Sequence, residues 1–139
     1  MNKNCLDQID KDVSEIISEN LPWDRFDNKS ILITGGTGFI GYYLVKTLLK
    51  LNDTKKISNP LSIFLIVRDI KYASKKFYNL KKNKQFNLIE WDLNTLSIPP
   101  VKDFDFIFHA ASNASPKYYK SDPIGTILPN TIGTTSLLK

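Results

Sequence analysis

Residues 34–41 read Thr34-Gly35-Gly36-Thr37-Gly38-Phe39-Ile40-Gly41, a stretch with four glycines in eight residues. A short, unbroken apolar run, residues 31–33, comes directly before it. Such a run is typical of a central parallel strand that is buried on both faces. After the stretch, in residues 39–51, apolar side chains recur at helical spacing. The pattern therefore predicts a buried strand, a tight turn and a helix in immediate succession.

The spacing of the glycines adds a chemical expectation to this structural one. Gly36, Gly38 and Gly41 follow the Gly-x-Gly-x-x-Gly pattern of dinucleotide-binding turns. Glycine is needed there because the chain turns sharply, its backbone approaches a pyrophosphate, and the helix packs closely on the strand. No Gly-Lys-Ser/Thr follows, which disfavours a phosphate-binding loop of the nucleotide triphosphatase type. We expect residues 35–41 to hold the diphosphate of a dinucleotide; the alternative is a purely structural turn.

The rest of the chain alternates between the two periodicities. We expect helices at 6–19, 39–51 and 70–80, and strands at 31–33, 63–67, 86–90 and 104–108, with 86–90 nearer the sheet edge. A last helix should begin at Asp122, as N-cap, with Pro123 in its first turn. Pro129 should kink this helix near Gly125. This order predicts an α/β fold: a Rossmann-type parallel sheet with helices on both faces, truncated after about four strands.

The length of 139 residues suits one main domain. We expect an N-terminal helix and lead-in at 1–28, and a nucleotide-binding domain at 29–139 that is incomplete at its C-terminus. The apolar fraction of 42% and the charged fraction of 24% are ordinary for a soluble protein. No apolar stretch approaches the roughly 20 residues needed to cross a bilayer. The polar start gives no export signal, so we expect a cytoplasmic protein without a membrane partner.

The single cysteine, Cys5, excludes an internal disulfide. The formal net charge is +5, and much of the excess lies between Lys71 and Lys84. We interpret these lysines as a solvated surface. Nucleic-acid binding is the alternative, but no recognition-helix pattern or zinc-ligand spacing accompanies them. We therefore expect no nucleic-acid partner and no metal site.

The glycine turn resembles the cofactor motif of the extended short-chain dehydrogenase/reductases, the NAD-dependent epimerase/dehydratase group. The run His109-Ala110-Ala111-Ser112 resembles the motif that follows the fourth strand in that family. The match continues in the usual order with Ser115-Pro116, Asp122-Pro123, Asn130 and Gly133-Thr134, and it covers about residue 21 to the end. Members that act on nucleotide sugars for surface polysaccharides are the most similar in character. The resemblance also allows a homodimer.

The resemblance implies further contacts with a nicotinamide dinucleotide. Asp92 would accept a hydrogen bond from the adenine amino group, with Leu93 beside it, and His109 would be structural. Small Ala110 and Ala111 would let the cofactor lie close. The candidate cofactor-binding residues are Gly35, Gly36, Thr37, Gly38, Phe39, Ile40, Gly41, Arg68, Asp69, Asp92, Leu93, Ala110, Ala111 and Ser112.

Arg68 and Asp69, at the end of the second strand, point to different cofactors. An acidic residue there would bind the adenosine ribose hydroxyls and favour NAD, whereas an arginine could pair with a 2′-phosphate and favour NADP. Both cofactors stay open, with the resemblance favouring NAD.

No catalytic residue is expected in this chain. The family uses a Tyr-x-x-x-Lys pair after a fifth strand, which would lie beyond Lys139. Three pairs have this spacing but precede the fourth strand, so we interpret them as coincidental: Tyr42 with Lys46, Tyr72 with Lys76, and Tyr78 with Lys82. We expect the N-terminal, cofactor-binding part of a nucleotide-sugar epimerase or dehydratase. The alternative is a non-catalytic binding module, or one chain of a split enzyme.

Overall fold

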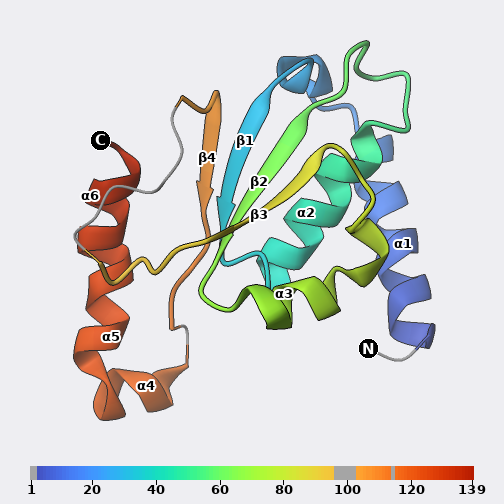
Figure 1. Cartoon of the computed structure of the whole chain (residues 1–139). Coiled ribbons are helices and arrows are strands. Elements are labelled where there is room, and N and C mark those ends of the chain that lie inside the picture. The colour runs from blue at the N-terminus through green and yellow to red at the C-terminus, as the bar shows by residue number, and fades with distance from the viewer. Residues whose placement is uncertain (1–2, 96–102, 114) are drawn as a thin grey trace.

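A computed structural model describes residues 3–95, 103–113 and 115–139 of the chain. The ranges predicted for the two parts of the chain, 1–28 and 29–139, also include residues outside these. The elements follow one another as α1 (Lys3–Ser18), η1 (Trp23–Phe26), β1 (Ser30–Thr34), α2 (Phe39–Leu51), β2 (Ser62–Val67), α3 (Ile70–Lys76), η2 (Tyr78–Leu80), β3 (Phe86–Glu90), β4 (Phe106–His109), α4 (Pro116–Ser121), α5 (Pro123–Leu128), η3 (Pro129–Gly133) and α6 (Thr134–Leu137) (Figure 1).

The four described strands form one parallel sheet in the order β3-β2-β1-β4. In the centre of the sheet, Ile33 of β1 is aligned with Leu65 of β2 and with Phe108 of β4. All carboxyl ends therefore lie at the same edge, where α2 and α3 begin (Figure 1). This arrangement confirms the predicted Rossmann-type fold, and β3 lies at the edge of the sheet as predicted.

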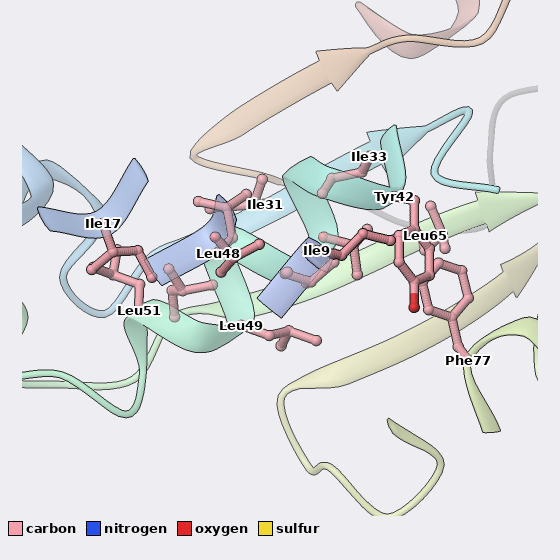
Figure 2. Packing of buried hydrophobic residues seen from close by; sticks show 14 of the residues in the cluster. Ile9, Ile17, Ile31, Ile33, Tyr42, Leu48, Leu49, Leu51, Leu65 and Phe77 are labelled. Atoms are coloured by element: carbon pink, nitrogen blue, oxygen red, sulfur yellow. The ribbon is translucent and has the colours of Figure 1, made fainter. Parts of the chain in front are cut away.

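The larger core lies between the sheet and helices α1 and α2. Alternate side chains of the central strands, among them Ile31, Ile33 and Leu65, are completely buried on this face. Leu48 of α2 and Ile17 of α1 belong to the same cluster (Figure 2). Continuous apolar strands thus supply residues to both faces of the sheet, and on this face helices cover them.

A second, smaller cluster covers the opposite face. Leu32 and Ile66 point away from the larger core and pack with Leu93, which follows β3, and Leu137 of α6. Helices therefore cover both faces, as the alternation of elements predicted (Figure 1).

Polar contacts hold α1 against α2. The hydroxyl group of Tyr43 donates a hydrogen bond of 2.7 Å to the carboxylate of Asp12, and Lys46 forms a 2.8 Å ion pair with Asp10. The bond to Asp12, together with desolvation, raises the pKa of Tyr43 to about 12. These contacts place the N-terminal helix on the same core as the sheet.

The C-terminal part of the chain differs from the expectation in three places. The short helix α4 was not predicted, and the last strand spans Phe106–His109 rather than 104–108. The helix after Asp122 begins as predicted, because the Asp122 side chain caps it by accepting a 2.9 Å hydrogen bond from the amide of Gly125. Its irregular part is a π-helical turn over Pro129–Gly133, not a kink near Gly125.

Candidate functional site

A cavity of about 230 Å³ opens at the carboxyl ends of the strands. Segments that are far apart in the sequence meet around it: the glycine turn, the end of β2, the loop after β3, the loop after β4 and the helix α5. The residues that line it are Gly35, Thr37, Gly38, Ile66, Val67, Arg68, Trp91, Asp92, Leu93, Asn94, Ala110, Ala111, Ser112, Asn113, Gly125 and Pro129. Ligands of open α/β sheets bind at this edge, outside the carboxyl ends of the strands.

Gly35 brings the glycine turn against the loop after β4. Its φ angle of +70° lies in the left-handed region, which side chains with a Cβ rarely adopt. A Cβ atom at this position would also overlap the backbone of Ala110 and lie 2.6 Å from the amide nitrogen of Ala111. The close approach of these two segments therefore requires glycine.

Two other glycines serve packing rather than the cavity. A Cβ atom on Gly36 would overlap the side chain of Leu65 on β2, and one on Gly41 would overlap the carbonyl oxygen of Gly35. Neither Gly36 nor Gly41 lines the cavity. Because both residues are glycines, α2 can start directly against the sheet. This close packing of the helix on the strand is one of the reasons why a dinucleotide-binding turn needs glycine.

The first turn of α2 faces this edge with main-chain amide groups. Gly38 is its N-cap, with extended backbone angles, and no side chain caps the helix. The amides of a first helical turn have no acceptor within their helix, and the helix dipole adds partial positive charge there. The Nζ atom of Lys76 donates a 2.7 Å hydrogen bond to the carbonyl oxygen of Thr37, which fixes the turn from the side of α3. The turn can therefore receive an anion.

A short hydrogen-bond chain holds the loop after β4. The Nε2 atom of His109 lies 3.0 Å from the carbonyl oxygen of Pro129, which can only accept, so Nε2 carries the proton. Nδ1 then accepts from the hydroxyl of Thr34, at 2.7 Å. The same hydroxyl oxygen accepts a 3.3 Å hydrogen bond from the amide of Ala111. His109 thus has a structural position, between the sheet and the C-terminal helices.

Two amide side chains connect the same loop to the C-terminal helices. Pro129 has no N–H, so the carbonyl of Gly125, four residues before it, lacks its usual donor. The side-chain amide of Asn113 donates to this carbonyl at 3.2 Å. The side-chain amide of Asn130 donates a 3.0 Å hydrogen bond to the hydroxyl of Ser112. Because Pro129 cannot donate to it, the Gly125 carbonyl is free to accept the hydrogen bond that orients the side chain of Asn113 at the cavity.

Most of the predicted cofactor-binding residues meet at this cavity. Gly35, Thr37, Gly38, Arg68, Asp92, Leu93, Ala110, Ala111 and Ser112 line it. Gly36, Phe39, Ile40, Gly41 and Asp69 do not. The side chains of Phe39 and Ile40 are 80% and 69% exposed, so what these residues offer the site is their main chain.

Several residues that line the cavity were not predicted from the sequence: Ile66, Val67, Trp91, Asn94, Gly125 and Pro129. Trp91 follows β3 directly, and its position at the carboxyl end of a strand was the signal that could have identified it. Gly125 and Pro129 reach the cavity only because the last helix folds back over the loop after β4, which no local pattern indicates.

Arg68 and Asp69 follow β2 but have different surroundings. Arg68 is exposed and lines the cavity. Asp69 is the N-cap of α3, and its carboxylate accepts a 2.8 Å hydrogen bond from the amide of Tyr72.

The Tyr–Lys pairs with catalytic spacing lie outside the cavity. Tyr42 is buried and stacks on Phe77, with ring centres 5.3 Å apart (Figure 2). Its spacing partner Lys46 forms an ion pair with Asp10, while Lys76 lies over the Tyr42 ring, with its Nζ atom 5.2 Å from the ring centre. Tyr72 and Tyr78 are exposed.

Within the described residues, no group of His, Cys, Asp or Glu side chains is arranged to hold a metal ion. No helix in the same residues is both long and apolar enough to cross a membrane.

Solved structures support the fold. The structure of Pen from Bacillus thuringiensis matches 81% of this chain and 33% of its own, with a TM-score of 0.63 and 21% identity. A short-chain dehydrogenase/reductase from Brucella melitensis, described as glucose/ribitol dehydrogenase, matches 82% of this chain and 49% of its own, with a TM-score of 0.59 and 18% identity.

The sequence itself has curated relatives. UDP-glucuronic acid decarboxylase 6 from Arabidopsis thaliana is 39% identical over 114 residues, which cover 80% of this chain. The matched part is 29% of that relative, so the chain spans less than a third of its length. The model of the NAD dependent epimerase/dehydratase family matches residues 31–139. By this match and by its fold, the chain belongs to the NAD dependent epimerase/dehydratase family.

Proposed function

We propose that this chain binds a nicotinamide dinucleotide and forms the cofactor-binding part of an enzyme that modifies nucleotide sugars. One observation carries the proposal: the uncapped first turn of α2 and the Gly35 turn open into a cavity that the ends of all four described strands surround.

The residues present fit such a cofactor. The diphosphate would lie at the amides of the first turn of α2, where main-chain donors and the helix dipole favour an anion. The adenine would lie toward Asp92 and Leu93, and the nicotinamide half toward Ala110, Ala111 and Ser112. When bound, the cofactor would accept or donate a hydride. The chain's own contribution is to hold and orient it through groups that are already positioned.

The substrate class rests on the relatives. They are named UDP-glucuronic acid decarboxylases, and UDP-glucuronic acid is a nucleotide sugar. We propose a nucleotide-sugar substrate for the whole protein, with a role in making surface polysaccharides, in the cytoplasm. The family name favours NAD, while Arg68 at the end of β2 keeps NADP open. A homodimer agrees with this proposal and is tested by measuring the size of the purified protein.

A second candidate is a binding module without catalysis, or one chain of a split enzyme. It is favoured by the composition of the cavity, since neither tyrosine nor lysine is among the described residues that line it. Turnover of a UDP-sugar by the purified chain alone would contradict this candidate. Turnover that requires a second polypeptide would support the split enzyme.

Calorimetric titration with NADH and NADPH tests cofactor binding. The variant Gly38→Asp is the sharpest probe, because aspartate is a good N-cap but places a negative charge where the diphosphate should lie. Gly38→Asn is the matched control, since asparagine has nearly the same shape, caps equally well and carries no charge.

We expect Gly38→Asp to bind at least about tenfold more weakly than Gly38→Asn, because the added charge repels a charged ligand at close range. Equal affinities of the two variants would contradict the assignment of the diphosphate to this turn. Failure of the folded wild-type protein to bind either dinucleotide would contradict the proposed function itself.

A further inference from the structure

We propose that Arg68 recognises the 2′-phosphate of NADP(H), so that the chain prefers the phosphorylated cofactor; this inference rests on the proposed function. In Rossmann-type folds the adenosine ribose lies near the end of the second strand, where an acidic residue binds the hydroxyls or an arginine accommodates a 2′-phosphate. Arg68 follows Val67, the last residue of β2, and lines the same cavity as Gly38.

The guanidinium group of Arg68 is available for a ligand. Arg68 is exposed. The ion pairs found within residues 3–95, 103–113 and 115–139 join Lys29, Lys46 and Lys50 to aspartates, and none includes Arg68. A guanidinium group offers a planar fork of donors that matches a phosphate, and no carboxylate of the described residues occupies it.

The neighbouring carboxylates are already engaged by α3. The carboxylate of Asp69 accepts the 2.8 Å hydrogen bond from the amide of Tyr72, and that of Glu90 accepts a 3.3 Å hydrogen bond from the amide of Ile70. Both therefore cap the first turn of one helix. If Asp69 turned toward a ribose diol, it would leave this amide of α3 without its acceptor. Asp69 also does not line the cavity, whereas Arg68 does, so the arginine is the residue that a ligand would meet after β2.

The acid that does line the cavity, Asp92, belongs to the loop after β3. One of its oxygens accepts a 3.0 Å hydrogen bond from the amide of Asn94, in its own loop. At the ribose end of the cavity, Arg68 is the charged side chain that lines the wall directly after β2. A charged phosphate gains more from it than a neutral hydroxyl does. Arg68 is therefore placed to distinguish a cofactor that carries a 2′-phosphate from one that does not.

Pairs of ligands that differ only in the 2′-phosphate test the assignment by calorimetry: NADPH against NADH, and adenosine 2′,5′-bisphosphate against AMP. The protein variants are Arg68→Gln, which removes the charge, and Arg68→Lys, which keeps it. Lys82→Gln is the matched control, because it removes one positive charge at an exposed position that does not line the cavity. Circular dichroism checks that each variant is folded.

We expect the wild-type protein to bind the phosphorylated member of each pair at least about tenfold more tightly, as a charge-assisted hydrogen bond can provide. Arg68→Gln should lose this preference while its affinity for NADH stays within about twofold. Arg68→Lys should keep part of the preference, and Lys82→Gln should keep all of it. The ratio of the affinities for the two members of each pair should also decrease as salt is added, since salt screens exposed charges.

The outcomes separate this inference from the proposed function. If NADH binds as tightly as NADPH, or more tightly, the inference is overturned and the proposed function stands. If Lys82→Gln lost as much of the preference as Arg68→Gln, the inference would also be overturned, because the preference would then depend on the overall charge of the protein. If the folded protein binds neither dinucleotide, the proposed function fails and the inference fails with it.

Discussion

At the scale of single residues, the site depends on a few positions where the backbone allows no alternative. Gly35 has a positive φ angle and lies against the backbone of Ala110 and Ala111. Gly38, three residues later, has ordinary extended angles, and a Cβ atom there would meet only the carbonyl oxygen of Gly35, at 3.1 Å. The two glycines therefore differ in what they contribute: the first shapes the fold, and the second leaves room for a ligand.

Alanine substitutions should separate these two contributions. Gly35→Ala should lower the free energy of unfolding by more than about 2 kcal/mol, since backbone strain and steric overlap add up. Gly38→Ala, the control, should change it by less than about 1 kcal/mol. Urea denaturation followed by tryptophan fluorescence measures both. Similar losses in the two variants would show that the turn is not fixed by its contact with the loop after β4.

Asp105 joins the starts of β1 and β4. Its carboxylate accepts hydrogen bonds from the amide and the hydroxyl of Ser30, each 2.8 Å long, and pairs with Lys29 at 2.9 Å. The backbone hydrogen bond from Ser30, followed by the bond from Lys29, lowers the pKa of Asp105 to about 2. The ionised form is therefore the one that the folded protein stabilises.

Because the pKa is lower in the folded protein than in the unfolded chain, this stabilisation is complete above the unfolded value of about 3.9. It should disappear as the pH falls toward about 2. The difference in unfolding free energy between the wild-type protein and Asp105→Asn should be constant from about pH 5 to 7 and shrink below about pH 4. Urea denaturation at each pH measures it. A difference that does not change with pH would contradict this role of Asp105.

At the scale of elements, the last helix shows how an irregularity can serve a site. Pro129 deprives the Gly125 carbonyl of its helical donor, and Asn113 supplies another from the loop after β4. The π-helical turn that follows spans Pro129–Gly133 and carries the carbonyl that His109 contacts. The sequence indicated an effect of Pro129 but not its position, because the compensating donors lie in a distant loop.

A double-mutant cycle tests this compensation. Asn113→Ala should lower the free energy of unfolding by about 1 kcal/mol, the usual worth of one hydrogen bond. In the Pro129→Ala background the loss should be smaller, since this substitution restores a main-chain N–H that can satisfy the Gly125 carbonyl along the helix. Chemical denaturation of the four proteins gives the coupling energy. Equal losses in both backgrounds would mean that the proline and Asn113 act independently.

Other elements differ in how far the sequence could predict them. The central strands were clear because burial on both faces makes them continuous apolar runs, as in residues 63–67. The helix α4 was missed because its sequence, Pro116–Ser121, is polar and none of its residues is buried. The capping role of Asp69 did have a local signal, since an aspartate directly before a periodic apolar segment is typical of an N-cap.

At the scale of the whole molecule, the layers were predictable and the cavity only in part. The alternation of strands and helices restricts the sheet to a parallel one with helices on both faces, as the two buried clusters show. The glycine turn was expected to hold the cofactor from its own pattern, and the loop after β4 was expected to lie beside the cofactor because of the family resemblance. Gly125 and Pro129 were not predicted to line the cavity, since their positions depend on how the last helix folds back over the loop after β4.

The proposed function depends above all on main-chain amides at the start of α2, which would hold the diphosphate of a dinucleotide. Hydrogen–deuterium exchange of the folded chain, with and without saturating NADPH or NADH, tests it directly. We expect slower exchange in residues 36–41, with weaker protection in 109–113, and little change in the surface of α1. A dinucleotide that binds without slowing exchange in residues 36–41 would contradict the claim.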